Sequence, residues 1–514
     1  MSPSSTLSPV LLLHPADDVL ITRTQLLSGQ VVDGLTVRGL IPAGHKLARR
    51  PIRTGEAIRR YHQIIGFALR DIAAGEHVHI QNLGMGDFAR DLQIGADVQP
   101  EAPRLQAQFM GFKRPNGQVA TRNYIGILSS VNCSATVARA IADHFSRPGP
   151  GPLSASPLTP YPHVDGVVAL THGSGCAMDD QGLGLQVLRR TLAGYARHAN
   201  FGAILIVGLG CESNQLDALL NAEQLQPSAL LETFNIQSLG GTSAAVARGI
   251  ELVQGLLPLA NAIQREPCSA EHLVVGLQCG GSDGYSGVSA NPALGHAVDR
   301  LVQHGGTALL SETPEIYGAE HLLSRRAISQ EVGEKLAERI RWWERHVQLH
   351  GGEMNNNPSP GNKVGGLTTI LEKSLGAVAK GGTSNLMDVL EYAQPVRRRG
   401  LVFMDTPGYD PVSATGQVAG GANLICFTTG RGSAYGCTPA PSLKLSTNTA
   451  LWQRQGDDID INCGEIVDGL CSVDAMGARI FQAMLDTASG RKTRSEIHGY
   501  GQNEFTPWLL GAVM

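Results

Sequence analysis

Charged residues are scarce in this chain of 514 residues. Asp, Glu, Lys and Arg make up 17% of it, whereas about a quarter is usual in globular proteins. The 41 basic and 45 acidic residues give a formal net charge of −4, and Lys and Arg form no extended block. Proteins that bind nucleic acid carry a strongly basic patch or stripe, so we expect no nucleic-acid partner.

Long apolar stretches are also missing. No apolar run approaches the roughly 20 residues that a membrane-spanning helix needs, so we expect no membrane partner. The first residues, MSPSSTLSPVLLLHPADD, have no basic segment ahead of their short apolar run, which is unlike a secretory signal. A cytoplasmic location is the expectation that follows.

Cysteines are few, and their number does not suit a disulfide framework. There are nine, an odd number, in a long chain without an export signal, so we expect no disulfides. In a reducing compartment a cysteine is a buried filler, a nucleophile or a metal ligand. The positions of the cysteines relative to the expected strands decide among these roles.

The composition suits a large folded protein with several domains. Hydrophobic residues make up 42% and there are 62 glycines, which indicates sizeable cores and many tight turns, and the length allows two to four domains. Residues 1–95 contain short runs of alternating apolar and polar residues, which predict a small β-rich domain. The polar, proline-containing stretch that follows, within residues 96–108, predicts a linker.

After the linker the pattern changes to apolar strands alternating with amphipathic helices. YIGILSS, VVAL and AILIVG are each followed by a helical pattern, and such alternation predicts a parallel sheet with helices packed on it. We assign this α/β domain to residues 109–265. HLVVGLQC, GLVFMDTP and ANLICFTTG continue the pattern, which predicts a second α/β domain over residues 266–514.

Three cysteines occupy equivalent places in the first of these α/β domains. Cys133, Cys176 and Cys211 each follow an expected strand and precede the next helix. Ligands bind outside the carboxyl ends of the strands in open α/β sheets, so we expect the three thiols to lie on one edge. A position near a helix N-terminus favours the thiolate, the form that binds metal.

Thiolates select zinc, Cu(I) or iron–sulfur clusters, and the close Cys pairs of a structural zinc site are missing here. We therefore favour an iron–sulfur cluster on the three cysteines, with one open iron that serves as a Lewis acid. A mononuclear ferrous site that uses His172, four residues before Cys176, is the alternative. Cys279 repeats the same strand-end pattern in the second α/β domain and is a further candidate ligand.

Several polar loops are candidates for binding or acid–base roles. Arg431 lies in a glycine-bounded loop after the strand NLICF, where a guanidinium can bind a carboxylate with two hydrogen bonds. Lys363 ends the turn-rich NPSPGNK segment. Other turn residues, for which a solvated role is equally well supported by the sequence, are His45, Lys46, His77 and His79.

A nucleotide-binding loop is not expected. GMGDFA, residues 84–89, has the outline of a dinucleotide loop, but no apolar strand leads into it and no long helix follows. A nicotinamide-dependent dehydrogenase is therefore the less favoured enzyme class.

Several long motifs together resemble the altronate/galactarate dehydratase family over nearly the whole chain. They are GFKRPNGQVATRNYIGIL, THGSGC, VGLGCE, GLQCGGSDGYSGVSANPALG, NPSPGNK and FTTGRGSAYG. The resemblance implies an N-terminal β domain of the SAF type followed by two α/β domains, a requirement for ferrous iron, and dehydration of a sugar acid to a 2-keto-3-deoxy acid. It also raises the importance of His45 and Lys46, which match the family's GHK motif.

The resemblance leads to expected roles for the candidate residues. A base would remove the proton at C2 of the substrate while iron takes the hydroxyl that leaves C3. The candidates for the acid or base are, in this order, His172, Lys363 and His45. The candidates for substrate binding are Arg431, Arg122, Asn123, Lys46, Glu212 and Asp283.

Two other functions fit the same scaffold. A sulfo-lyase would expel sulfite from sulfolactate, and a non-catalytic protein would bind a sugar acid without turnover, although the latter leaves the grouped cysteines unexplained. The sequence does not fix which sugar acid is used. A homodimer is expected because it is the commonest assembly of soluble enzymes.

Overall fold

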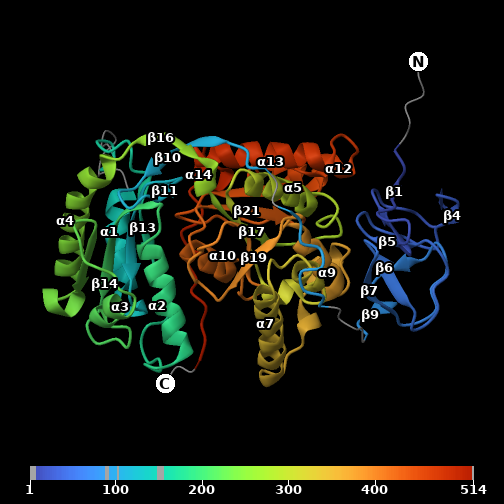
Figure 1. Cartoon of the computed structure of the whole chain (residues 1–514), viewed down its shortest axis with the longest axis horizontal. Helices are drawn as coiled ribbons and strands as arrows, with labels where there is room; N and C mark the ends of the chain where they lie inside the picture. The colour runs from blue at the N-terminus through green and yellow to red at the C-terminus, as the bar shows by residue number, and fades with distance from the viewer. Residues whose placement is uncertain (1–6, 87–91, 101–102, 147–155, 512–514) are drawn as a thin grey trace, which may run out of the picture.

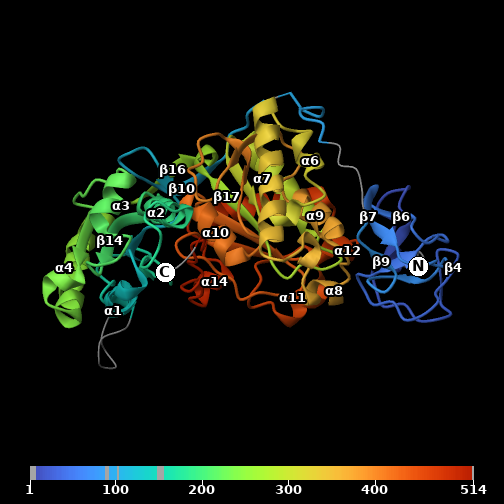
Figure 2. The same ribbon diagram turned by 90° about the horizontal axis from the view of Figure 1, so that it is seen from below.

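The computed structural model describes residues 7–86, 92–100, 103–146 and 156–511. Three bodies lie in a row: a β domain at one end, an α/β domain built from residues 111–261 at the other end, and a C-terminal α/β domain between them (Figures 1 and 2). The β-rich domain and the two α/β domains expected from the sequence are therefore confirmed.

The N-terminal domain consists of short antiparallel strands. Its two larger sheets have the orders β1-β2-β5-β8 and β6-β7-β9, and β3 pairs with β4. The strands are β1 (Val10–Leu11), β2 (Val19–Thr22), β3 (Val31–Val32), β4 (Leu35–Thr36), β5 (Lys46–Ala48), β6 (Ala57–Arg60), β7 (Gln63–Ala68), β8 (His77–Val78) and β9 (Leu83–Gly84). Antiparallel pairing with turns of a few residues explains the short apolar runs in the sequence.

The second domain is a parallel sheet of order β13-β12-β14-β15. Helices α1 and α4 share one buried apolar cluster on one face, and α2 and α3 contribute to another on the opposite face. The elements are β12 (Tyr124–Ser129), α1 (Ala135–Ser146), β13 (Gly166–Leu170), α2 (Leu183–Ala196), β14 (Phe201–Gly208), α3 (Leu216–Ala222), β15 (Leu231–Asn235) and α4 (Thr242–Asn261).

A small antiparallel sheet joins the second domain to the C-terminal domain. Its order is β11-β10-β16, formed by β10 (Gln108–Lys113), β11 (Val119–Ala120) and β16 (Arg265–Ser269). The strands that enter and leave the second domain thus pair with each other, so the two connections lie side by side.

The C-terminal domain is built on a seven-stranded parallel sheet of order β19-β20-β18-β17-β21-β22-β23. Its strands are β17 (Val274–Cys279), β18 (Thr307–Ser311), β19 (Leu386–Leu390), β20 (Gly400–Met404), β21 (Leu424–Thr429), β22 (Ser442–Ser446) and β23 (Ile461–Asn462). Its helices are α5 (Ala290–Gln303), α6 (His321–Ser324), α7 (Gln330–Leu349), α8 (Pro360–Val364), α9 (Ile370–Ala379), α10 (Asp410–Ala419), α11 (Thr449–Arg454), α12 (Gly464–Val467), α13 (Val473–Ala488) and α14 (Arg494–Ile497).

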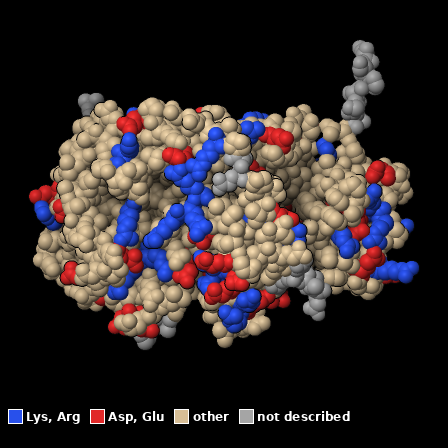
Figure 3. All heavy atoms as spheres, in the orientation of Figure 1, with Lys and Arg blue, Asp and Glu red and all other residues tan. Residues whose placement is uncertain are grey.

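Helices cover both faces of this sheet. Helices α5 and α13 pack together and belong to the largest apolar cluster, whereas α10 lies on the other face and packs against α2 of the second domain. The surface is hollowed where these two domains meet, and Lys and Arg side chains gather around the hollow (Figure 3). The carboxyl ends of the strands lie at the opposite edge, which faces the β domain.

The expected strands and helices around the cysteines are all present, each within a few residues of its predicted bounds. In the part of the chain that the structure covers, no helix combines the length and apolarity needed to cross a membrane. Of the rejected dinucleotide-like segment, Asp87, Phe88 and Ala89 lie outside the described residues.

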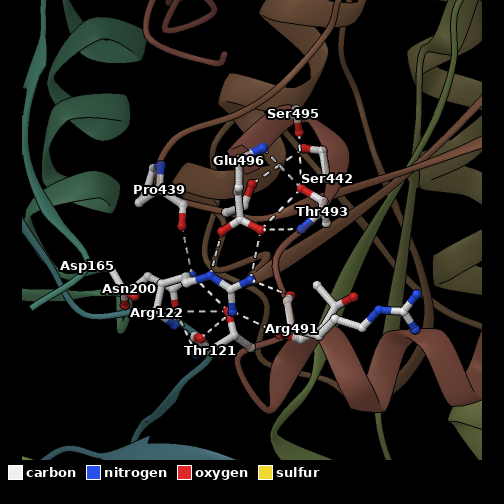
Figure 4. A network of polar contacts seen from close by, with 12 residues as sticks. Thr121, Arg122, Asp165, Asn200, Pro439, Ser442, Arg491, Thr493, Ser495 and Glu496 are labelled. Atoms are coloured by element: carbon white, nitrogen blue, oxygen red, sulfur yellow. Dashed lines mark hydrogen bonds and ion pairs between the residues drawn. The ribbon is translucent and has the colours of Figure 1, made fainter. Parts of the chain in front are cut away.

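A buried ion pair joins the second domain to the C-terminal domain (Figure 4). Arg122 is 2% exposed and donates through Nε and Nη2 to both carboxylate oxygens of Glu496, at 2.6 and 2.8 Å. Its three other N–H groups donate to backbone carbonyl oxygens, namely those of Thr121, Thr487 and Arg491. Every donor of the guanidinium is therefore used within the protein.

The side chain of Asn123 is also fully hydrogen-bonded within the protein. Its side-chain oxygen accepts a hydrogen bond from Arg114, and its amide donates to the carbonyl oxygens of His163 and Ala260. Arg122 and Asn123 were expected to bind substrate, but their side-chain donors are used within the protein: those of Arg122 mainly across the domain boundary, and those of Asn123 within the second domain.

We expect Arg122→Ala to destabilise the folded chain by about 3–5 kcal/mol, because it takes the cationic partner from the largely buried Glu496 carboxylate and a donor from several carbonyl groups. Urea unfolding measures this difference. The matched control is Arg248→Ala, which removes an exposed pair with Glu251 and is expected to change stability by less than about 1 kcal/mol. Equal stability of the two variants would contradict the docking role.

A buried histidine at the same domain boundary makes stability depend on pH. His198 Nε2 donates to the carbonyl oxygen of Ala422 at 3.0 Å, while Nδ1 accepts from the backbone N–H of Asn200 at 3.1 Å. Burial lowers the pKa of His198 from its usual 6.5 to about 4. Between these pH values the unfolded chain binds the proton and the folded chain does not, so stability falls as the pH falls.

Protonation of His198 is expected to lower the free energy of unfolding by about 3 kcal/mol as the pH falls from 6.5 to 4. His198→Gln keeps a side-chain N–H donor but does not titrate, so its stability should fall less steeply over that range. Unfolding free energies of both proteins, measured at several pH values, test this. Parallel curves for the two proteins would show that His198 does not titrate as described.

Candidate functional site

The three predicted cysteine ligands lie on three neighbouring loops at the carboxyl edge of the second-domain sheet. Cys133 follows β12, Cys176 follows β13 and Cys211 follows β14, and these strands are adjacent in the sheet. All three thiols are exposed and free. We call this set the thiol rim.

Backbone hydrogen bonds lock these loops to one another. The N–H of Asn132 donates to Ser174 O and the N–H of Asn214 donates to Gly175 O, both at 2.9 Å. Gly175 has a φ of +103°, and a Cβ there would lie 2.5 Å from Ser130 O, so only glycine allows this approach. The loops thus hold the thiols on one rim, as the topology predicted.

The spacing of the thiols bears on which metal group they can hold. Among the described His, Cys, Asp and Glu side chains, the thiols do not form a set of three ligand atoms that all lie within 4.8 Å of one another. A single ion binds thiolates at about 2.3 Å and so needs them that close. A cluster, in which each thiolate binds a different iron, accommodates a wider spacing, and the cluster on this rim remains a prediction.

His172 and Glu212 support the thiol rim. His172 Nε2 donates to Ser129 O at 2.9 Å, and Nδ1 accepts from the N–H of Ser174 at 3.3 Å. Burial lowers its pKa to about 4, so the ring is neutral and both nitrogens are occupied. Burial alone would raise the pKa of Glu212, but hydrogen bonds from Gly210, Leu209 and Ser130 lower it.

A second set of predicted residues meets at the junction between the β domain and the C-terminal domain. His45 immediately precedes β5, and His77 lies on β8, which pairs with β5. His79 is two residues further along, so it points to the same side as His77. One ring nitrogen from each of these histidines lies within 4.8 Å of the others. We call these three residues the histidine triad.

The triad is in the form that binds metal. Burial lowers the pKa of all three imidazoles, that of His77 to about 4 and that of His79 to about 3, so they are neutral at pH 7. His45 Nδ1 lies 3.0 Å from His77 Nε2. His79 Nδ1 is buried and has no hydrogen-bond partner among the described residues. Its lone pair is therefore available to a ligand or ion.

Lys46 docks the β domain onto the C-terminal domain. Its ammonium is fully buried and donates to both oxygens of Glu372 at 2.9 Å and to Gly366 O at 2.6 Å. Arg60 donates to the same carboxylate at 2.6 Å and to Gly284 O at 2.6 Å. All three ammonium protons are thus used, so Lys46 has no donor left for substrate, contrary to our expectation.

The Glu372 carboxylate stays ionised despite its burial. Desolvation raises its pKa, but the charges of Lys46 and Arg60 outweigh it and lower the pKa to about 2. Two glycines let the domains approach this closely: a Cβ on Gly284 would lie 2.0 Å from Gly44 O. The turn that carries His45 is therefore held directly against the C-terminal domain.

Asp283 organises the loops of the C-terminal domain at this junction. Its buried carboxylate accepts hydrogen bonds from Thr447, Ser286 and Asn448, and from the backbone of Tyr285. With its acceptors occupied, Asp283 acts as a structural hub beneath the surface.

Lys363 and Arg431 are the cations that remain available. Lys363 is half-buried on α8, directly before Val364, whose carbonyl oxygen accepts from His45 Nε2 at 3.2 Å. Arg431 is exposed at the end of β21, beside the loop of Gly281. Neither side chain has a hydrogen bond or ion pair with another described residue. Both can therefore bind an anionic ligand.

Cys279 lies at the same junction and not at the thiol rim. Its buried sulfur is 2.8 Å from Ser282 Oγ, and Ser282 O accepts from Asn362 at 2.9 Å. It ends β17 of the C-terminal sheet, whereas the three exposed thiols follow strands of the second-domain sheet. A role of Cys279 as a fourth ligand stays a prediction.

A buried charge cluster lies beside Cys279, and the sequence analysis missed it. Its members, which follow neighbouring strands or lie on the helices packed there, are Glu312, Glu315, Lys373, Lys380 and Asp410. Burial raises the pKa of Asp410 to about 6. Four atoms in the cluster have no hydrogen-bond partner in the described part of the chain, one each on Glu312, Glu315, Lys380 and Asp410. Such unsatisfied groups are typical of functional sites.

The predicted residues thus divide into separate places. The thiol rim, with His172 and Glu212, belongs to the second domain, and the histidine triad to the β domain; these two domains lie at opposite ends of the molecule (Figures 1 and 2). Lys363, Arg431, Asp283 and Cys279 belong with the triad. For His77 and His79 the sequence supported a solvated turn at least as well as a functional role. The informative observation is that β8, which begins at His77, pairs with β5 next to His45.

Known proteins resemble the chain along nearly all of its length. Residues 8–86 match the family model described as Altronate/galactarate dehydratase SAF domain. Residues 111–261 match D-galactarate dehydratase/Altronate hydrolase, second domain, and residues 270–513 match D-galactarate/Altronate dehydratase, C-terminal.

Individual relatives agree with these matches. Galactarate dehydratase (L-threo-forming) of Escherichia coli is 37% identical over 93% of this chain and 92% of its own length. Altronate dehydratase of Bacillus subtilis is 33% identical over 95% of this chain and 96% of its own length. The beta subunit of (2R)-sulfolactate sulfo-lyase of Chromohalobacter salexigens is 29% identical over 76% of this chain and 95% of its own length.

We expect the histidine triad to bind one divalent transition-metal ion. Titration of cobalt(II), followed by its visible absorption, measures the affinity. His77→Ala removes a ligand and should weaken binding at least about tenfold. His62→Ala, on the exposed ring that stacks on His14 in the same domain, is the matched control and should bind as the unmodified protein does. Unchanged affinity in His77→Ala would rule out the site.

Proposed function

Because the chain belongs to the altronate/galactarate dehydratase family, we propose that it removes water from a sugar acid of the altronate or galactarate type and forms a 2-keto-3-deoxy acid. The observation that supports a site at the domain junction is the histidine triad, with its buried, unpartnered nitrogen, beside two unpaired cations. These groups match the needs of a polyhydroxy carboxylate that must lose a proton and a hydroxyl group.

The triad fits iron. Neutral imidazoles suit ferrous iron, and His45, His77 and His79 would hold it and leave coordination positions open. Bound there, iron supplies a Lewis acid for the departing hydroxyl group. Interactions around the triad hold it in place: Lys46 of β5 pairs with Glu372, and His45 Nε2 donates to Val364 O.

The roles of the protein side chains follow from their surroundings. Arg431 binds the substrate carboxylate with its exposed guanidinium. Lys363, whose half-buried side chain is unpaired among the described residues, takes the proton from C2 when its amine is in the neutral form. The C3–O bond then breaks, the hydroxyl group leaves as water after taking a proton, and the enol formed becomes the 2-keto-3-deoxy acid. Lys46 and Arg60 keep the β domain closed over this site.

The thiol rim is the second candidate for iron. Three exposed thiols on interlocked loops favour a cluster there, and such a cluster would supply an open iron at the opposite end of the molecule. Iron and acid-labile sulfide, measured in the triple variant Cys133→Ser, Cys176→Ser, Cys211→Ser and in His77→Ala, distinguish the two placements. Loss of iron and sulfide in the cysteine variant alone would move the proposed site to the thiol rim.

The function is tested with a panel of aldonates and aldarates incubated anaerobically with ferrous iron, followed by detection of 2-keto-3-deoxy acids. We expect turnover of altronate or galactarate. A protein that only binds sugar acids would give no product with any of them. Release of sulfite from sulfolactate, without dehydration of any sugar acid, would instead identify a sulfo-lyase.

Lys363→Ala is expected to lower kcat at least about 100-fold while iron content is unchanged, because the proton acceptor is lost. Lys335→Ala is the matched control, since Lys335 is an exposed lysine on α7 that pairs with Glu331. Full activity in Lys363→Ala would remove Lys363 from the mechanism. A homodimer remains our expectation for the active assembly.

A further inference from the structure

Two adjoining hollows lie at the amino edge of the C-terminal sheet, opposite the edge that faces the histidine triad. Their volumes are about 620 and 570 Å³, and Arg399 lines both of them. The starts of β17, β18 and β20 border them, at Val274, Thr307 and Gly400. The larger one reaches α2 of the second domain, so it spans the boundary between two domains.

Arginine dominates the walls of these hollows. The lining arginines are Arg104, Arg190, Arg197, Arg300, Arg397, Arg398 and Arg399. The lining carboxylates are fewer: Glu223, Glu271 and Asp299. We call this lined space the arginine cleft. Its excess of positive charge stands out because the whole chain has a net charge of −4. Figure 3 shows Lys and Arg side chains gathered around the hollow at this boundary.

The carboxylates in and around the cleft already have ion-pair or hydrogen-bond partners. Arg190 pairs with Glu391 at 3.1 Å, Arg197 with Glu223 at 4.0 Å, and Arg399 with Glu271. Asp299 instead accepts hydrogen bonds from Thr383 and Ser384. Each acid therefore already has a donor.

Several guanidinium groups are left over. Arg300, Arg397 and Arg398 are exposed, and none forms an ion pair with a carboxylate in the described ranges. Arg397 and Arg398 are consecutive with Arg399 in the segment that leads into β20. Like charges this close repel one another unless an anion neutralises them. The arrangement therefore suits a ligand that carries several negative charges.

We propose that the arginine cleft binds a small phosphorylated ligand with a chain of phosphate groups, at a site separate from the dehydratase site. Guanidinium groups match phosphate oxygens with paired hydrogen bonds, and the hollows have the size of small-molecule sites. A sugar acid has at most two carboxylates, and Arg431 already suits a carboxylate at the other edge of the sheet. The cleft thus has no role in the proposed dehydration.

The position of the cleft gives binding a structural consequence. Arg190 lies on α2 of the second domain and Arg197 directly follows that helix, whereas Arg397 and Arg398 come from the C-terminal domain. A ligand held by both sets joins the two domains. Binding therefore stabilises the folded protein in proportion to ligand concentration, and it weakens as ionic strength rises because the contacts are exposed charges.

Calorimetric titration of the full chain with inorganic tripolyphosphate at low ionic strength tests the proposal. We expect saturable binding at one site, and at least a tenfold loss of affinity in the double variant Arg397→Ser, Arg398→Ser. The charge-matched control is Arg341→Ser, Arg345→Ser, two exposed arginines on α7, and it should bind as the unmodified protein does. Circular dichroism establishes that each variant is folded, and Arg300→Ser provides a second, single-residue test.

Two further ligands identify the chemistry. A nucleoside triphosphate that binds more tightly than tripolyphosphate would show that the site also recognises a base, whereas equal affinity assigns recognition to the phosphates. Citrate binding as tightly as tripolyphosphate would overturn the phosphate assignment. No binding of tripolyphosphate, or equal binding by the Arg397→Ser, Arg398→Ser variant, would overturn the site. His77→Ala should bind tripolyphosphate normally, so failure of the dehydratase proposal leaves this one intact.

Discussion

The buried ion network of Lys46, Arg60 and Glu372 is the interaction on which the junction depends. Two cations of the β domain share one carboxylate of α9 in the C-terminal domain, and all of these groups are removed from water. A buried charge without its partner costs several kcal/mol, so the domains have one favourable relative position. That position sets the turn of His45 against Val364 O. The three histidines meet within the β domain through the pairing of β8 with β5, and docking places Lys363 and the C-terminal strand edge beside them.

Parallel sheets give this molecule more than one place for chemistry. The carboxyl ends of the second-domain strands present Cys133, Cys176 and Cys211, and those of the C-terminal sheet present Cys279, the buried charge cluster and Arg431. The two edges face different surroundings, because only the C-terminal sheet is covered by the β domain (Figure 1). The amino edge of the C-terminal sheet carries the arginine cleft instead. The proposed dehydratase site and the arginine cleft therefore lie at opposite ends of the strands of the same sheet.

Local sequence patterns predicted the elements well but not their long-range partners. Strand and helix periodicity located the loops of the three cysteines, because the direction of parallel strands alone places such loops on one edge. The partner of Lys46 is 326 residues away in the chain, and the partner of Arg122 is 374 residues away, so no local pattern reveals that both side chains are already occupied. The same holds for the arginine cleft: Arg397, Arg398 and Arg399 are a short run, and their charge becomes notable only beside Arg190 and Arg300. His77 and His79 needed the register of β8 on β5 to become candidates.

The position of iron tests the central claim most directly. Crystals grown anaerobically with ferrous iron can be measured on both sides of the iron absorption edge, and the difference in anomalous scattering locates the metal without reference to activity. We expect a single strong peak between the imidazole rings of His45, His77 and His79. Iron found only at Cys133, Cys176 and Cys211 in catalytically active crystals would contradict the account and transfer the dehydratase site to the second domain.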